Sequence, residues 1–287
     1  MAVRFMLRMR SATAFFALLA GVAAPSASAV AQDAAPAVAS DPVPAYADLV
    51  ELARASDIVA RVVVADQAEV KPERAPGLKA GEARLYIEAE TQALLAGRSG
   101  IGESLAFLAD LPLTDRGKAP RIKQQVYLVF ADLVPSRPGT IQLVGAGAMQ
   151  LATPPAEAAV RRVLTQLAQA TQPPVITGIR EVMSVAGNLA GESETQIFLE
   201  TDSGAPVSLS VIRRPSMAPQ WGVSWSEIVD SSATAPAPET LAWYALACHL
   251  PPSLSGATFL SGDSPSRARA EADYRVILDS LGPCRGG

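Results

Sequence analysis

Cys248, His249 and Cys284 carry the side chains of this chain that are best suited to nucleophilic or metal chemistry, and His249 is its only histidine. A cysteine beside a histidine is the pairing that cysteine hydrolases use, because the imidazole takes the proton of the thiol. Neighbouring residues of a helix point about 100° apart, so Cys248 and His249 do not face each other within one helix. We therefore expect His249 to be a polar residue near the end of a helix.

Cys248 and Cys284 are the two cysteines of the chain, and both lie in its last 40 positions. In an oxidising compartment an even number of cysteines indicates a disulfide before it indicates a catalytic or metal-binding thiol. We predict a structural disulfide between Cys248 and Cys284. A reactive Cys248 thiol is the alternative.

The N-terminal sequence predicts such a compartment. Three arginines precede an apolar run from Ala12 to Ala24, and the small residues Ala27-Ser28-Ala29 follow it. These are the three parts of a signal peptide, so we expect cleavage of residues 1–29 and a periplasmic or secreted protein. An N-terminal membrane anchor is the alternative, but the apolar run is shorter than the about 20 residues that span a bilayer. We predict no transmembrane segment after removal of the signal.

Metal and cofactor motifs are missing from the sequence. One histidine and two cysteines 36 residues apart do not form a zinc motif, and no calcium-binding loop pattern occurs. The glycine-rich segment 97–102 lacks the Lys-Ser/Thr of a phosphate loop, and the segment 145–150 lacks the third glycine of a dinucleotide fingerprint. We expect no metal and no cofactor.

Glu88 and Glu90 offer a route to acid–base catalysis without histidine. They alternate with Leu85, Ile87 and Ala89, so both carboxylates project from one face of a strand. A solvated face explains this pattern as well, and carbohydrate clefts usually contain more aromatic residues than the 5% found here. A periplasmic hydrolase that uses His249 or this carboxylate pair is the alternative to a non-enzymatic protein.

The charge of the chain bears on its partners. Its formal net charge is −4, and the three arginines near the N-terminus belong to the predicted signal peptide. Nucleic acids and anionic membranes attract clustered lysine and arginine, so neither is expected as the main partner. A protein or a component of the cell envelope remains the expected partner.

Residue patterns between positions 46 and 172 predict a small antiparallel sheet or barrel with a helix on each side. A helical stripe begins at Tyr46, and a β-branched run follows at 58–70. Further strands are expected at 84–95, 103–111, 124–133 and 140–151. A second helix is expected after Thr153, which is suited to cap it, and before the Pro173-Pro174 pair.

Residues after 173 predict a second region. A hairpin is expected to turn at Asp202-Ser203-Gly204, and another strand is expected at 220–230. Helices are predicted at 238–250 and 264–281, the second with a Glu271–Arg275 pair. Tryptophans 221, 225 and 243 are interpreted as core residues rather than a binding surface.

These patterns predict an α+β protein of mostly antiparallel strands. We expect a signal peptide (1–29), a flexible Ala/Pro-rich leader (30–44), a β-barrel-like domain with flanking helices (45–172) and an α+β domain with a C-terminal helical pair (173–287). A chain of this length exceeds the usual size of a single core, which supports two domains.

Residues 46–151 resemble the small secreted β-barrel modules of the netrin-like, tissue-inhibitor-like (OB-type) kind. The resemblance rests on "LARASDIVARVVV", "ETQALLAG" and the strands that follow. The segments "GESETQIFLETDSGAPVSLSVIRRP" and "WGVSWSEIVD" resemble exported bacterial proteins without an assigned function. The cysteines that staple the animal inhibitors are absent, so the resemblance implies a fold and not inhibition. We therefore expect a non-enzymatic binding or accessory protein; a structural envelope protein without a discrete ligand is a further alternative.

Overall fold

The computed structural model describes residues 44–226 and 233–285. The predicted signal peptide and nearly all of the predicted leader lie outside the described residues. The described chain forms two sheets with four α-helices, and the strands are mostly antiparallel. The predicted α+β class is therefore confirmed.

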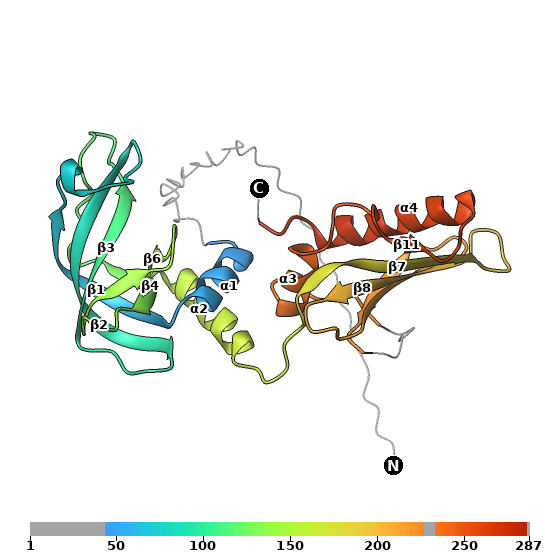
Figure 1. Cartoon of the computed structure of the whole chain (residues 1–287), viewed down its shortest axis with the longest axis horizontal. Helices are drawn as coiled ribbons and strands as arrows, with labels where there is room; N and C mark the ends of the chain where they lie inside the picture. Colours follow the sequence, from blue (N-terminus) through green and yellow to red (C-terminus); the bar gives the residue numbers. More distant parts are fainter. Residues whose placement is uncertain (1–43, 227–232, 286–287) are drawn as a thin grey trace, which may run out of the picture. The chain divides into compact units, whose positions relative to one another are not determined.

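The first sheet contains six strands that all pair antiparallel in the order β3-β2-β1-β4-β5, with β6 also pairing with β4. Their bounds are β1 Ile58–Glu69, β2 Glu82–Gly97, β3 Ser104–Pro112, β4 Val126–Leu133, β5 Ile141–Leu143 and β6 Met149–Leu151. The long strands β1 to β3 are strongly curved (Figure 1). One parallel bridge, from Ala106 to Thr140, joins the start of β3 to the start of β5 and closes the curved sheet into a barrel.

Alternating side chains build the core of this barrel. On β2, Leu85, Ile87 and Ala89 are buried, whereas Glu88 and Glu90 are exposed, as the sequence pattern predicts. Residues of the other strands complete the core, among them Val62, Val64, Leu105, Phe107, Val129 and Ile141. The connection from β1 to β2 includes a short 3₁₀ helix, Pro72–Arg74.

Helices α1 (Tyr46–Ala55) and α2 (Pro154–Leu167) lie side by side at the two ends of the barrel sequence (Figure 1). The start of α2 agrees with the sequence: the Thr153 hydroxyl accepts a hydrogen bond from the Ala156 N–H, and Pro154 occupies the first turn. Val160 and Val163 of the predicted apolar stripe are buried.

The side-chain amide of Gln166, near the end of α2, forms hydrogen bonds with α1 and with the start of helix α3 (Leu241–Ala247). The Gln166 Oε1 accepts hydrogen bonds from the Tyr46 hydroxyl at 2.7 Å and from the Leu241 N–H at 3.1 Å. The Gln166 Nε2 donates to the Glu239 carbonyl oxygen at 3.1 Å. Burial raises the pKa of Tyr46 to about 12, so its hydroxyl is a proton donor at neutral pH.

The second sheet has the strand order β10-β9-β8-β7-β11. Its strands are β7 Ile176–Ala186, β8 Ser193–Thr201, β9 Val207–Arg213, β10 Gln220–Ser224 and β11 Thr258–Phe259. Helix α4 (Ser264–Leu281) lies along β7 and β8 (Figure 1). The predicted hairpin between β8 and β9 is confirmed, and Gly204 in its turn adopts a φ of 71°.

Some expected elements differ from the structure. The run at 140–151 divides into β5 and β6, because the chain turns at Gly145–Ala148 before it meets β4 again. The two residues of β11 pair parallel with β7, and the sequence did not indicate this strand. Helix α3 covers seven residues rather than thirteen, since the chain leaves the helix after Cys248.

Helix α4 has the bounds that the sequence predicts, Ser264–Leu281. Asp263 caps it by accepting a hydrogen bond from the Ser266 N–H, and Ser264 is its first residue. Among the described residues, Glu271 and Arg275 do not form the expected salt bridge. Both side chains are exposed, and an ion pair between exposed side chains contributes little to stability.

The tryptophans contribute to the core, as predicted. Trp243 is buried, and Trp221 and Trp225 pack against the same apolar cluster, which includes residues of α1, α2, α3, α4 and the second sheet.

No helix of the described chain is both long and apolar enough to cross a membrane. The proposed domain boundary near residue 172 stays a prediction.

Candidate functional site

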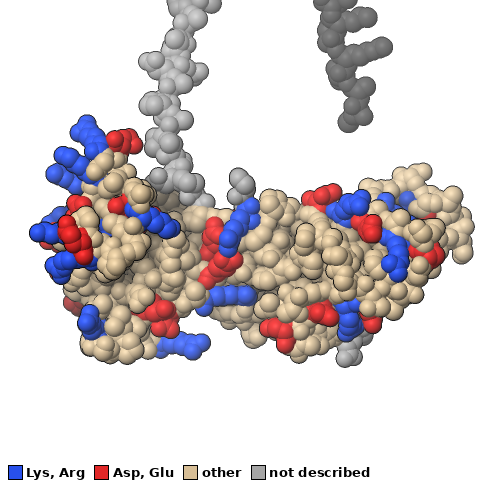
Figure 2. Space-filling view, turned by 45° about the horizontal axis from the view of Figure 1, so that its top comes forward, with Lys and Arg blue, Asp and Glu red and all other residues tan. Residues whose placement is uncertain are grey.

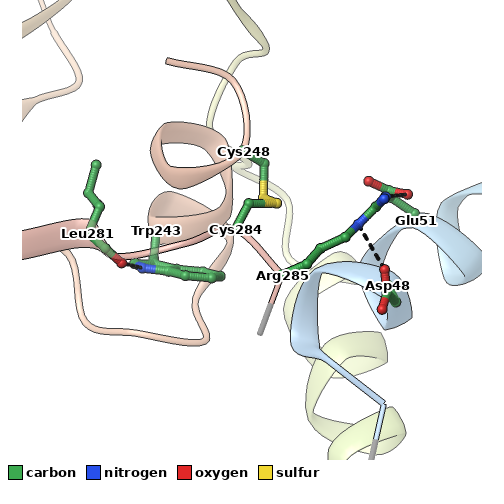
Figure 3. Close-up of a disulfide and its surroundings, with 7 residues drawn as sticks. All are labelled: Asp48, Glu51, Trp243, Cys248, Leu281, Cys284 and Arg285. Atoms are coloured by element: carbon green, nitrogen blue, oxygen red, sulfur yellow. Dashed lines mark hydrogen bonds and ion pairs between the residues drawn. A yellow bond between two sulfur atoms is a disulfide. The ribbon is translucent and has the colours of Figure 1, made fainter. Parts of the chain in front are cut away.

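The predicted disulfide between Cys248 and Cys284 is present in the structure, with the two Sγ atoms 2.13 Å apart (Figure 3). Cys248 is the C-cap of α3, and Cys284 follows the C-cap of α4 by two residues. The indole N–H of Trp243 donates to the Leu281 carbonyl oxygen at 2.9 Å beside it. Both contacts join the end of α4 to α3, so the two cysteines form a structural disulfide.

Arg285 follows the disulfide and reaches α1. Its guanidinium lies 2.9 Å from the Asp48 carboxylate and 2.5 Å from the Glu51 carboxylate (Figure 3). All three side chains are about half exposed, so solvent weakens these ion pairs.

His249 lies just beyond α3, near a helix end as expected. Its ring meets the edge of the Tyr244 ring, with centroids 5.2 Å apart. Its Nδ1 is buried and has no hydrogen-bond partner among the described residues. A general base needs a partner that orients its imidazole, and no recorded contact of His249 supplies one. The geometry therefore gives no support to a hydrolase that uses His249.

Glu88 and Glu90 remain on one face of β2, and both are exposed. They border a shallow pocket of about 340 Å³ together with Ser104, Pro138 and Thr140. No group of three or more His, Cys, Asp or Glu side chains suitable for a metal ion occurs within 44–226 and 233–285. The two carboxylates are thus a solvated pair, and nothing recorded around them favours acid–base catalysis.

Asp273 of α4 forms the most buried polar cluster. Its carboxylate, which is completely buried, accepts hydrogen bonds from the Thr195 hydroxyl and from the Arg213 Nε. The Ser184 hydroxyl oxygen lies 2.9 Å from that of Thr195. Each oxygen of the carboxylate thus has a hydrogen-bond partner within the protein, and the cluster binds α4 to β7, β8 and β9.

A groove of about 900 Å³ opens on the surface of the barrel. We call it the β2–β3 groove. Strands β2 and β3 form one wall, and the β4–β5 turn, β5 and the segment 145–149 form the other. Its lining includes Lys79, Arg84, Tyr86, Leu108, Asp110 and Arg137.

Tyr86 and Leu108 are the apolar centre of the β2–β3 groove. They are direct cross-strand partners, and their side chains are 41% and 49% exposed. Large apolar side chains on a sheet usually pack against a second layer. Here the pair faces the groove, which leaves apolar area available to a ligand.

Arg84 and Asp110 form the adjacent cross-strand pair. The guanidinium donates two hydrogen bonds to the carboxylate, at 2.6 and 2.7 Å, and a third to the Pro76 carbonyl oxygen. The hydrogen bonds from Arg84 hold the pKa of Asp110 below its usual value, and those to Asp110 raise the pKa of Arg84. The pair is therefore charged at neutral pH and fixes the polar side of the groove.

Positive and negative side chains are interspersed on the face of the molecule drawn in Figure 2, with wide uncharged areas between them. This distribution differs from the continuous basic surface that nucleic acids attract. The groove follows the same pattern, because its five charged lining residues are Lys79, Arg84 and Arg137 with Glu82 and Asp110.

The groove was not among the sites expected from the sequence. The alternation on β2 placed Tyr86 on the wet face, and a large aromatic residue there is the one signal that pointed to it. The position of Leu108 opposite Tyr86 depends on the register of β3, which the sequence does not give.

No protein-family model matches the chain, and no curated protein matches it significantly.

Proposed function

We propose that this protein is exported and acts as a non-enzymatic binding or accessory module for another protein of the cell envelope or the extracellular space. The signal-like N-terminal sequence and the Cys248–Cys284 disulfide support an oxidising destination. A periplasmic or secreted location follows from the same argument.

The observation that carries the proposal is the exposed Tyr86–Leu108 pair inside the β2–β3 groove. Interfaces concentrate their binding energy in aromatic and apolar side chains that a polar rim surrounds. The Arg84–Asp110 pair, Lys79 and Arg137 provide such a rim. A volume of about 900 Å³ is at the upper end of the range of ligand pockets, which suits part of a polypeptide.

The strand order supports the resemblance to OB-type barrels. The first strand lies between the second and the fourth, and the third strand meets the fifth. In OB-type barrels the ligand site is the face of the second and third strands with the loops beside it. The β2–β3 groove occupies the corresponding face of this barrel.

Site-specific photocrosslinking tests the proposal. A photoreactive amino acid replaces Leu108 in one variant and Leu260, which is 54% exposed and lies outside the groove, in a control variant. After irradiation of each variant in its own envelope fraction, we expect a defined crosslinked partner from position 108 and none from position 260.

A second pair of variants checks that the groove itself binds. Tyr86→Ala, introduced into the variant that carries the photoreactive residue at position 108, should remove the captured partner while the melting temperature stays close to that of the variant without this change, because the Tyr86 side chain is 41% exposed. Leu260→Ala is the matched control. Equal crosslinking from positions 108 and 260 would refute the groove as the binding site.

A further inference from the structure

The backbone of β3 directs its N–H and C=O groups alternately to two sides of the strand. The Thr91 N–H donates to the Glu103 carbonyl oxygen and the Leu113 N–H donates to that of Gly81, so odd-numbered positions face β2. The Ala106 N–H instead donates to the Gly139 carbonyl oxygen, at 2.8 Å. In an antiparallel pair, successive residues direct their N–H and C=O groups to opposite sides. Even-numbered positions of β3 therefore face away from β2.

Leu108 and Asp110 consequently direct their backbone N–H and C=O groups into the β2–β3 groove. The bridge from Ala106 to Thr140 is an isolated one, and β3 has no other strand partner besides β2 within the described chain. From Leu108 onward this side of β3 is an unpaired strand edge. Such edges form hydrogen bonds with an added strand unless the protein covers them.

A cation stands near each end of this free edge. Arg137 belongs to the turn that ends at Thr140, the partner of Ala106, and its carbonyl oxygen accepts from the Thr140 N–H. Lys79 precedes Glu82, which pairs with Pro112 at the other end. Six steps of about 3.3 Å separate Ala106 from Pro112, so this stretch of β3 is about 20 Å long, and the free edge from Leu108 onward makes up about 13 Å of it.

These two cations are available to a ligand. No salt bridge of Lys79 or Arg137 is recorded with any residue that the structure describes, whereas Arg84 is engaged by Asp110. Without that pair, the groove lining keeps two positive side chains against one negative side chain, Glu82. The free edge thus combines unpaired backbone groups with a positive charge at both ends.

We propose that the β2–β3 groove binds an extended polypeptide segment of about six residues, which adds as a strand to the free edge of β3 at Leu108 and Asp110. Acidic residues near both ends of the segment face Lys79 and Arg137. Alternate apolar side chains contact Leu108 and the groove lining, since strand addition takes affinity from the backbone and specificity from alternate side chains. This inference rests on the proposed binding function and specifies the chemistry of the partner.

Synthetic hexapeptides on an array provide the probe. Each carries alternating valine and threonine between two end residues, which are glutamate in one set and lysine in the other. We expect the full-length protein to bind the glutamate-ended set about fivefold more tightly, as two exposed ion pairs imply. N-methylation of alternate backbone amides should abolish this binding, because it removes the donors that pair with β3.

Amide exchange measured by NMR locates the added strand. Binding of the glutamate-ended peptide should slow exchange of the Leu108 and Asp110 amides by tenfold or more. The Phe107 and Ala109 amides are the internal control, since they already face β2 and should change little. Unchanged exchange at Leu108 and Asp110, or binding that tolerates N-methylation, would overturn strand addition.

Charge reversal tests the end positions. Lys79→Glu with Arg137→Glu should reverse the preference toward the lysine-ended peptides, whereas Lys71→Glu with Arg98→Glu, at exposed cations outside the groove, should preserve it. If position 108 crosslinks a partner but no array peptide binds, the inference fails and the proposed function stands. If position 108 captures nothing more than position 260, the proposed function fails as well.

Discussion

The barrel and the second sheet differ in what they bury. The barrel core contains apolar side chains on every strand, among them Leu85, Phe107 and Ile141. The eight buried polar or charged residues of the described chain all lie in the second sheet or in α4. They are Ser184, Ser193, Thr195, Ser208, Ser210, Ser224, Ser266 and Asp273.

This difference separates two ways of specifying a structure. A barrel buries the apolar faces of its strands against one another, so alternation alone defines its inside and outside. The second sheet needs α4 to cover it, and hydrogen bonds at Asp273 with the Cys248–Cys284 disulfide fix that helix. We therefore expect the second region to depend on a few individual residues and the barrel to depend on its overall pattern.

Removal of the disulfide should have the largest effect. The bond closes a loop of 36 residues, for which the chain-entropy treatment gives about 3–4 kcal/mol. Cys248→Ser and Cys284→Ser should each lower the unfolding free energy by this amount, and the double variant should be no less stable than either. Urea titration measures the change.

Exchange measurements on the same variants sharpen the comparison. Amides of α4 should exchange faster in Cys284→Ser, while those of β2 in the barrel should not. A free Cys248 that is alkylated in protein isolated without reductant would contradict the structural role of the Cys248–Cys284 disulfide.

Asp273→Ala should cost about 3 kcal/mol of unfolding free energy. The substitution leaves Arg213 without its buried partner and removes one of the two acceptors beside the Thr195 hydroxyl. Asp279→Ala, an exposed position on the same helix, is the matched control and should change stability by less than about 0.5 kcal/mol. Equal stabilities of the two variants would show that the cluster does not hold α4.

The Arg84–Asp110 pair should make a smaller, pH-dependent contribution on the barrel. The pKa of Asp110 is lowered in the folded protein, so the stabilisation is complete above the ordinary carboxyl pKa of about 3.9 and is lost as pH falls through the depressed value. Asp110→Asn should therefore cost about 1 kcal/mol at pH 7 and almost nothing at pH 2. Asp115→Asn is the exposed control, and a difference that grows toward low pH would contradict the assignment.

His249→Ala should have the smallest effect. It removes an edge contact with Tyr244 and an imidazole nitrogen without a recorded partner, which together cost about 0.5 kcal/mol. Crosslinking from position 108 should be unchanged. Loss of a hydrolytic activity on this substitution, with the fold intact, would restore the catalytic interpretation.

Local patterns predicted many of the elements. The alternation of Leu85 and Ile87 gave the buried face of β2, Thr153 gave the start of α2, and Gly204 gave the turn between β8 and β9. Each of these signals depends on neighbours within a few positions, which is why the sequence carries it.

Features that depend on distant residues were not predictable. Asp273 looks like an ordinary exposed acid of a helix until α4 brings it to Thr195, 78 positions away. The two residues of β11 form a strand because β7 accepts them. The β2–β3 groove exists only because β3 and β5 stop pairing after one bridge, and no residue type encodes that separation.

The hydrogen bonds of Gln166 also determine which way its amide lies. The Oε1 receives two donors and the Nε2 faces an acceptor, so exchanging the two atoms would place donors against donors. Glutamate has almost the same shape but offers two acceptors and no donor when ionised. The contacts between α1, α2 and α3 therefore require the Gln166 amide dipole in one orientation. Gln166→Glu preserves the side-chain volume but not these hydrogen bonds, so it is not a conservative substitution.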